Sequence, residues 1–154
     1  MHKSSAWPLA LVYVGLIVYA SLYPFTEWRY QGIVSWAFMS AGLPRYWTGF
    51  DVVSNVLGYG PLGFLLALSA LRTERGRLAV GGATAVAALL SFSMESLQGF
   101  LPSRVPSNVD WGLNVLGAWA GGRLFHGLAS ERIYRNVALA ILFATGMFGL
   151  LREW

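Results

Sequence analysis

The chain contains no cysteine, so it forms no disulfide bond and no metal site built on thiolates. It is also poor in charge, because only 12% of its 154 residues are Asp, Glu, Lys or Arg. A soluble domain usually carries about 25%. Apolar residues make up 56% of the chain, and the mean hydropathy is +0.53. These values predict an integral membrane protein that forms a single domain over residues 1–154.

Long apolar runs separate the few charges and predict membrane-spanning helices. A helix needs about 20 residues to cross the hydrocarbon core. The last two runs are shorter and are expected to borrow flanking residues. The predicted fold class is all-α, a polytopic membrane helical bundle of about five transmembrane helices. The predicted spans cover residues 7–23, 50–71, 78–97, 109–124 and 137–151.

Lysine and arginine predict the orientation of the bundle, because both are enriched in cytoplasmic loops. With the N-terminus inside, seven basic residues are cytoplasmic and four are outside, which favours an N-in, C-out topology. The net charge of +4 reflects basic residues that flank the predicted spans, so it gives no reason to expect a nucleic-acid partner. The cytoplasmic set is Lys3, Arg72, Arg75, Arg77, Arg123, Arg132 and Arg135, and the outer set is Arg29, Arg45, Arg104 and Arg152.

The segment from Thr26 to Gly49 lies on the outer side in this topology and is rich in aromatic rings. Such rings prefer the headgroup zone of a bilayer, so an interfacial segment is expected. Two interpretations stay open: an aromatic belt that anchors the outer surface, or a wall or lid over a site. The rings belong to Trp28, Tyr30, Trp36, Phe38, Tyr46 and Trp47.

One short pattern occurs twice, as "DVVSNVLG" from Asp51 and as "DWGLNVLG" from Asp110. Both read D-x-x-x-N-V-L-G, and both open an apolar run. Thr48 and Ser107 precede the two acids by three residues, the spacing of a capping box, in which a hydroxyl and a carboxylate bind the free N–H groups of a helix start. An acid also suits the positive end of a helix dipole. Each aspartate therefore has a purely structural interpretation.

Capping does not explain the two asparagines. Asn55 and Asn114 lie one turn inside the acids, about 6 Å deeper on the same helix faces. A primary amide in hydrocarbon needs hydrogen-bond partners. It finds them either in the other asparagine, as a contact between helices, or in a polar site. Gly58 and Gly117 extend these faces and allow a second backbone or a ligand to approach closely.

Glu95 is the third acid of the apolar region. The stretch "LLSFSMESLQGF" places Ser91, Glu95 and Gln98 on one helix face. In the predicted topology Glu95 lies near the C-terminal end of its span, where the helix dipole disfavours an anion. Acids within membranes are costly and are usually functional. The alternative is a carboxylate that snorkels to the interface.

Arg104 lies in "FLPSRVPSNVD", a short proline-stiffened connection that makes the third and fourth spans neighbours. It is expected to reach Glu95 and Asp110, either as a structural salt bridge or to grip a phosphate or carboxylate. Because three acids face one arginine, we expect at least one acid, Glu95 first, to hold a proton or to pair with a bound cation. Pro61 predicts a kink that opens a pocket nearby.

These motifs resemble the VanZ-like family of bacterial membrane proteins over about residues 50–122, the motif-bearing core. The resemblance implies a small helical bundle, multi-pass in the bacterial cytoplasmic (inner) membrane, and a contribution to glycopeptide resistance of the teicoplanin type. Asn55 stands where many relatives have His. The residues that carry the resemblance are Asp51, Asn55, Pro61, Leu62, Gly63, Glu95, Gln98, Arg104, Asp110, Asn114 and Gly117.

Three functions stay open. The first is the binding or handling of an anionic lipid-linked cell-envelope molecule at an outward-facing polar site, alone or with a larger membrane partner protein. The second is a membrane enzyme, a transferase or hydrolase in which Glu95 is the catalytic acid or base. The third is a structural subunit of an envelope complex. No cofactor or metal is expected, because capping accounts for the aspartates better than an ion held by three acids. The predicted substrate-binding residues are Asp51, Asn55, Gln98, Arg104, Asp110 and Asn114.

Overall fold

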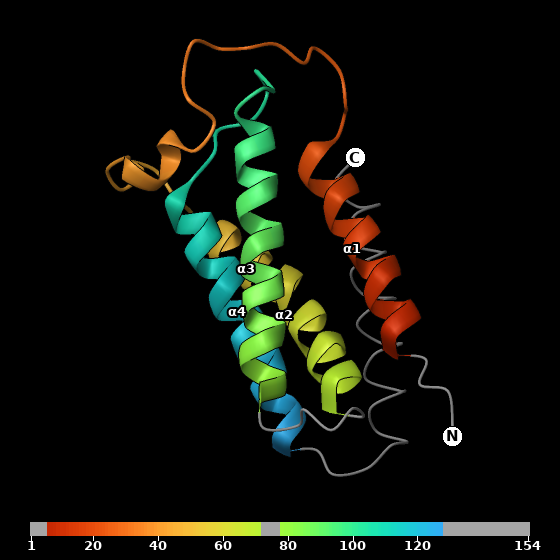
Figure 1. Cartoon of the computed structure of the whole chain (residues 1–154). Coiled ribbons are helices and arrows are strands. Elements are labelled where there is room, and N and C mark those ends of the chain that lie inside the picture. Colours follow the sequence, from red (N-terminus) through yellow and green to blue (C-terminus); the bar gives the residue numbers. More distant parts are fainter. Residues whose placement is uncertain (1–5, 72–77, 128–154) are drawn as a thin grey trace.

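The computed structural model describes residues 6–71 and 78–127, which form four α-helices and one short 3₁₀-helix (Figure 1). No strand occurs within these two ranges, so the predicted all-α class is confirmed for the described chain. The elements are α1 (Ala6–Leu22), η1 (Ala37–Ser40), α2 (Gly49–Leu71), α3 (Ala79–Gln98) and α4 (Asn108–Gly127).

The first four predicted spans each correspond to one helix, with ends that shift by at most three residues. α2 and α3 are long and apolar enough to cross a membrane, whereas α1 has 17 residues and is shorter. α4 has 20 residues, so it is longer than the predicted fourth span. The fifth predicted span, residues 137–151, and the basic cluster of Arg72, Arg75 and Arg77 lie outside the described residues. The five-span topology and its orientation therefore stay predictions.

α2 is the central helix and packs against α1, α3 and α4, most extensively against α4. Its second half, from Pro61 to Leu68, is buried at every position. A helix that is apolar all round is expected at the centre of a bundle. α2 also continues as one helix through Pro61, so the proline does not end it.

Glycines bring α2 and α4 into close contact. A methyl group added at Gly117 would collide with the backbone of Val56, and one at Gly121 would collide with the backbone of Gly60. On the facing helix, a methyl group added at Gly63 of α2 would likewise collide with the backbone of Ala118 of α4. Small residues at such a crossing let helix backbones approach closely and pack well inside a membrane. We call this set the glycine seam; it comprises Gly60, Gly63, Gly117 and Gly121.

α1 packs on the bundle through one face. Its buried residues Ala6, Ala10, Tyr13 and Ile17 recur at helical spacing. The Tyr13 hydroxyl donates a hydrogen bond of 2.9 Å to the carbonyl of Gly58, which ties α1 to the first half of α2. Large apolar side chains, Leu11 and Leu16 among them, are exposed on α1. This arrangement suits a helix with lipid on its outer side.

The aromatic segment between α1 and α2 crosses over the end of the bundle and carries η1 (Figure 1). The backbone N–H of Arg29 donates to the carbonyl of Phe100, and the Gln31 side chain donates to the carbonyl of Gly99. Phe38 is buried, with its ring centroid 5.6 Å from that of Phe92. The other predicted belt residues are exposed: Trp28, Tyr30, Trp36, Tyr46 and Trp47.

Candidate functional site

A polar cavity of about 360 Å³ lies at the end of the bundle where α1 and α3 end and where α2 and α4 begin. All seven residues that the sequence proposes for the site line this polar cavity: Asp51, Asn55, Glu95, Gln98, Arg104, Asp110 and Asn114. Among the described residues, none of the aromatic segment from Thr26 to Gly49 lines it. This segment is therefore no wall of the cavity, and the remaining lining comes from Ile17, Ala20, Ser21, Ser54, Gly58, Tyr59, Met94, Ser103 and Val105.

The first copy of the repeated motif forms a complete capping box. The carboxylate of Asp51 accepts hydrogen bonds of 2.8 Å from both the backbone N–H and the hydroxyl of Thr48. The backbone N–H of Asp51 donates in return to the Thr48 hydroxyl at 3.2 Å. The structural interpretation of Asp51 is thus confirmed, although the same side chain also lines the polar cavity.

The second copy forms only half of that box. The backbone N–H of Asp110 donates to the Ser107 hydroxyl at 3.2 Å, but the N–H of Ser107 donates to Oε2 of Glu95 at 2.8 Å. Glu95 therefore takes the place that the Asp110 carboxylate would occupy in a capping box. The Asp110 side chain instead lies beside Asn55, in a region where Asp51 and Glu95 both repel its charge. The capping interpretation fails for this carboxylate.

Glu95 is buried, with only 4% of its surface exposed. It lies in the last turn of α3, and its bond to Ser107 ties the end of α3 to the start of α4. A carboxylate that snorkels to the interface would be exposed, so this alternative is wrong. A buried carboxylate needs hydrogen bonds to offset the loss of its hydration, and the Ser107 N–H supplies one.

Asn114 is equally buried, at 4% exposure, and bonds to α3 rather than to the other asparagine. Its amide nitrogen donates to the Ser91 hydroxyl at 3.0 Å, while its oxygen Oδ1 has no hydrogen-bond partner among the described residues. The predicted contact of Asn against Asn is therefore wrong. The hydroxyl of Tyr59 is buried in the same region, facing Ser91 and without a well-formed hydrogen bond to any described residue.

Arg104 and Gln98 reach the C-terminal end of α1. Nη2 of Arg104 donates to the carbonyls of Ala20 and Tyr23, both at 3.1 Å. The Gln98 amide donates to the carbonyl of Ser21 at 3.0 Å. The last carbonyls of a helix lack internal donors, and a cation there also complements the helix dipole. These two side chains therefore fix α1 as one wall of the polar cavity.

The fold and the cavity allow a comparison with known proteins. A comparison with protein families matched the VanZ/LLP1 family over residues 6–129. The chain belongs to the VanZ/LLP1 family. No curated protein and no solved structure matched it. Together with the two apolar helices, family membership identifies a helical membrane protein.

The VanZ/LLP1 match begins at residue 6, well before the motifs that suggested the family. It therefore includes α1, whose residues Ile17, Ala20 and Ser21 line the polar cavity. Sequence reasoning missed these wall residues, and it also missed Tyr59. Tyr59 lies one turn beyond Asn55 on the same face of α2, and this spacing is the signal that could have found it.

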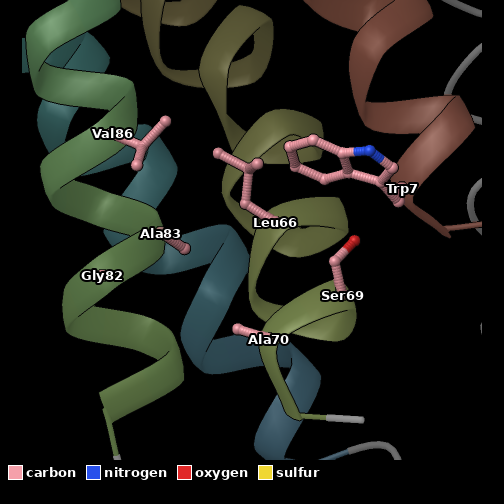
Figure 2. A pocket seen from close by; sticks show the side chains of 7 residues that line it. All are labelled: Trp7, Leu66, Ser69, Ala70, Gly82, Ala83 and Val86. Carbon is pink, nitrogen blue, oxygen red and sulfur yellow. The ribbon is translucent and has the colours of Figure 1, made fainter. Parts of the chain in front are cut away.

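A second hollow of the VanZ/LLP1 domain, of about 250 Å³, lies at the opposite end of the bundle (Figure 2). It is formed by α1, α2 and α3, with the Trp7 indole next to Leu66. None of its described lining residues is ionisable: Trp7, Leu66, Ser69, Ala70, Gly82, Ala83 and Val86. Of these two hollows, only the polar cavity therefore has acidic and basic side chains in its described lining.

The two acids of the repeated motif should respond differently to truncation. We expect Asp51→Ala to destabilise the VanZ/LLP1 bundle by about 1 kcal/mol, because it removes a complete capping interaction. Asp110→Ala should cost less, since its carboxylate forms no cap and its loss relieves repulsion by Asp51 and Glu95. Unfolding of both variants in detergent measures the difference. Equal losses would contradict the asymmetry of the two motifs.

Proposed function

We propose that the polar cavity binds the headgroup of an anionic lipid-linked molecule of the cell envelope. The observation that carries this proposal is the lining itself, in which eleven polar or charged side chains from four helices and one loop surround about 360 Å³. Small-molecule sites typically enclose about 300–1,000 Å³. A cavity at the end of a membrane bundle also lies at the depth of lipid headgroups.

Arg104 is assigned to the phosphate of that headgroup. It is the only basic side chain among the described residues that line the polar cavity. Its bonds to Ala20 and Tyr23 hold the guanidinium at the wall, so the positive charge is positioned before a ligand arrives. A guanidinium carries five N–H donors and a fixed positive charge, so a hydrogen bond from it to a phosphate oxygen is charge-assisted and strong. Neighbouring amides and hydroxyls, such as Asn55 and Ser103, complete the donor set.

An acid–base enzyme is the second candidate, and the position of Glu95 favours it. This carboxylate is buried but still lines the polar cavity, where a bound headgroup would meet it. A general acid or base has to lie within hydrogen-bond reach of the group on which it acts. Catalysis would use the same ligand and the same cavity, so binding is the function to test first.

Binding can be measured by native mass spectrometry of the purified full chain. We expect phosphatidylglycerol to bind at least about tenfold more tightly than diacylglycerol with the same acyl chains, because only the former carries a phosphate. Arg104→Gln should abolish this preference. Arg45→Gln removes an exposed arginine outside the polar cavity and should leave the preference intact. Equal binding of the two lipids by the unaltered chain would refute the proposal.

The proposal also places the polar cavity on the outer side of the membrane. Because the chain lacks cysteine, single cysteines can report its orientation. In spheroplasts, an impermeant thiol reagent should label Tyr46→Cys and leave Leu78→Cys unlabelled. Both positions are well exposed, at 92% and 74%, and they lie at opposite ends of the bundle. The reverse labelling pattern would place the polar cavity in the cytoplasm and would contradict this part of the proposal.

A further inference from the structure

The charges around the polar cavity do not suit a purely anionic ligand. Its lining carries three acids, Asp51, Glu95 and Asp110, against the single Arg104. Even if Glu95 holds a proton, the two aspartates outnumber the arginine. Asp51 and Asp110 lie close enough to repel each other, and Glu95 adds to the repulsion at Asp110. Like charges held together in a partly buried site favour the binding of a positive group.

Buried acceptor atoms at the same cavity point to the same kind of ligand. Oδ1 of Asn114 has no hydrogen-bond partner among the described residues, although 96% of the Asn114 surface is buried. The Tyr59 hydroxyl, on a side chain that is 5% exposed, also lacks a well-formed bond within the described chain. Both residues line the polar cavity, with these two atoms just beneath its surface. A buried polar atom without a partner is costly, so a small side-chain rotation that brings either atom to a hydrogen-bond donor in the cavity would be favourable.

The acids among the described residues do not form a protein cage for a metal ion. No three His, Cys, Asp or Glu side chains of the described residues lie close enough together to hold one metal ion. The acceptors are instead spread over α2, α3 and α4, around a space large enough for several atoms. A protonated primary amine has three N–H donors and a positive charge, and it can donate to acceptors that lie on different sides of it.

We infer that the headgroup bound in the polar cavity carries a protonated amine as well as a phosphate. Arg104 takes the phosphate, and the ammonium group lies against Asp110 and the Oδ1 atom of Asn114. This inference rests on the proposed function and narrows its ligand class to phosphate-bearing molecules with a free amine. It also gives a role to the Asp110 carboxylate, which forms no cap and whose hydrogen bond with Asn55 uses only one of its several acceptor sites.

The test compares lipids that differ only at the amine. Native mass spectrometry of the full chain is carried out with phosphatidylethanolamine and with its N-acetylated form, which keeps the phosphate and the acyl chains. We expect the free amine to bind about tenfold more tightly, as for one charge-assisted hydrogen bond. Asp110→Asn keeps the shape of the side chain and should reduce this preference to about twofold or less. Glu27→Gln removes an exposed acid outside the polar cavity and should leave the preference for the free amine unchanged.

The outcomes separate this inference from the proposed function. If both lipids bind equally to the unaltered chain, the amine assignment is wrong while the phosphate site stands. If neither lipid binds, both are wrong. Phosphoethanolamine, the same headgroup without acyl chains, identifies the source of the ligand. If it binds as tightly as the lipid, the amine assignment stands and the ligand is a soluble molecule. Thermal unfolding of Asp110→Asn verifies that a lost preference does not reflect a lost fold.

Discussion

Gly117→Ala should lower the stability of the bundle by about 1–3 kcal/mol, the usual cost of overpacking a close contact. The added methyl group would collide with backbone atoms of Val56 rather than with a side chain that can move aside. α2 and α4 would have to separate, and both carry residues of the polar cavity. The loss should appear as a lower thermal midpoint in detergent and as weaker lipid binding.

Gly112→Ala is the matched control, because it makes the same change on the same helix. No atom lies within 4 Å of the methyl group that it would add. Alanine is also the better helix former by about 1 kcal/mol, so this variant should be unchanged or slightly more stable. If both variants behave alike, the glycine seam does not hold α2 against α4.

Replacing Glu95 should separate its structural contribution from its chemical one. Glu95→Leu removes the acceptor of the Ser107 N–H and should cost about 1–3 kcal/mol, the penalty for a buried donor without a partner. Glu95→Gln keeps an oxygen at that position, so it should fold close to normally. Unfolding of the two variants in detergent measures this contrast. Equal destabilisation would show that the charge of Glu95, rather than its hydrogen bond, stabilises the bundle.

The glutamine variant also distinguishes binding from catalysis. An amide mimics the protonated acid in shape, but it neither takes up nor releases a proton. If Glu95 only positions Ser107 and the headgroup, Glu95→Gln should retain lipid binding and any resistance phenotype. If Glu95 is an acid or base, the variant should bind ligand and lose function. A folded variant that fails to bind would contradict both roles and would place Glu95 in the recognition of the ligand.

Hydropathy and motif spacing predicted most of the fold. Four helices follow the apolar runs, because a run of about 20 apolar residues has few alternatives to a membrane helix. The site residues were found because helical periodicity places acids, amides and Gln98 at the same end of their spans. Up-and-down connections then bring those ends together, as they do around the polar cavity.

The pairing of side chains was not predictable from the sequence. Arg104 donates to the carbonyls of Ala20 and Tyr23, at the C-terminal end of α1 and more than 80 positions earlier in the chain. The sequence contains no local signal for such a contact. The two motifs also look equivalent in sequence. They differ because Glu95 lies beside the second motif and takes its capping N–H.

The glycines of the two motifs diverge for a similar reason. Gly117 lies against the backbone of Val56, whereas no atom lies within 4 Å of a methyl group added at Gly58. Gly58 instead lines the polar cavity, and its carbonyl accepts the bond from Tyr13. Both outcomes, the approach of a backbone and space for a ligand, were expected for such glycines. Only the packing of four helices decides which outcome applies to each.

The central claim is that the polar cavity is a ligand site and not only a layer that holds helices together. The most direct test measures lipid binding and thermal stability on the same samples of Arg104→Lys. Lysine keeps the positive charge, but its compact ammonium has three donors in place of the planar set of five that Arg104 presents to the carbonyls of Ala20 and Tyr23 and to a phosphate. We predict that binding of phosphatidylglycerol falls about tenfold while the thermal midpoint stays near that of the unaltered chain. If binding and stability fall in proportion, or if binding does not change, the polar cavity is a packing layer and the claim is wrong.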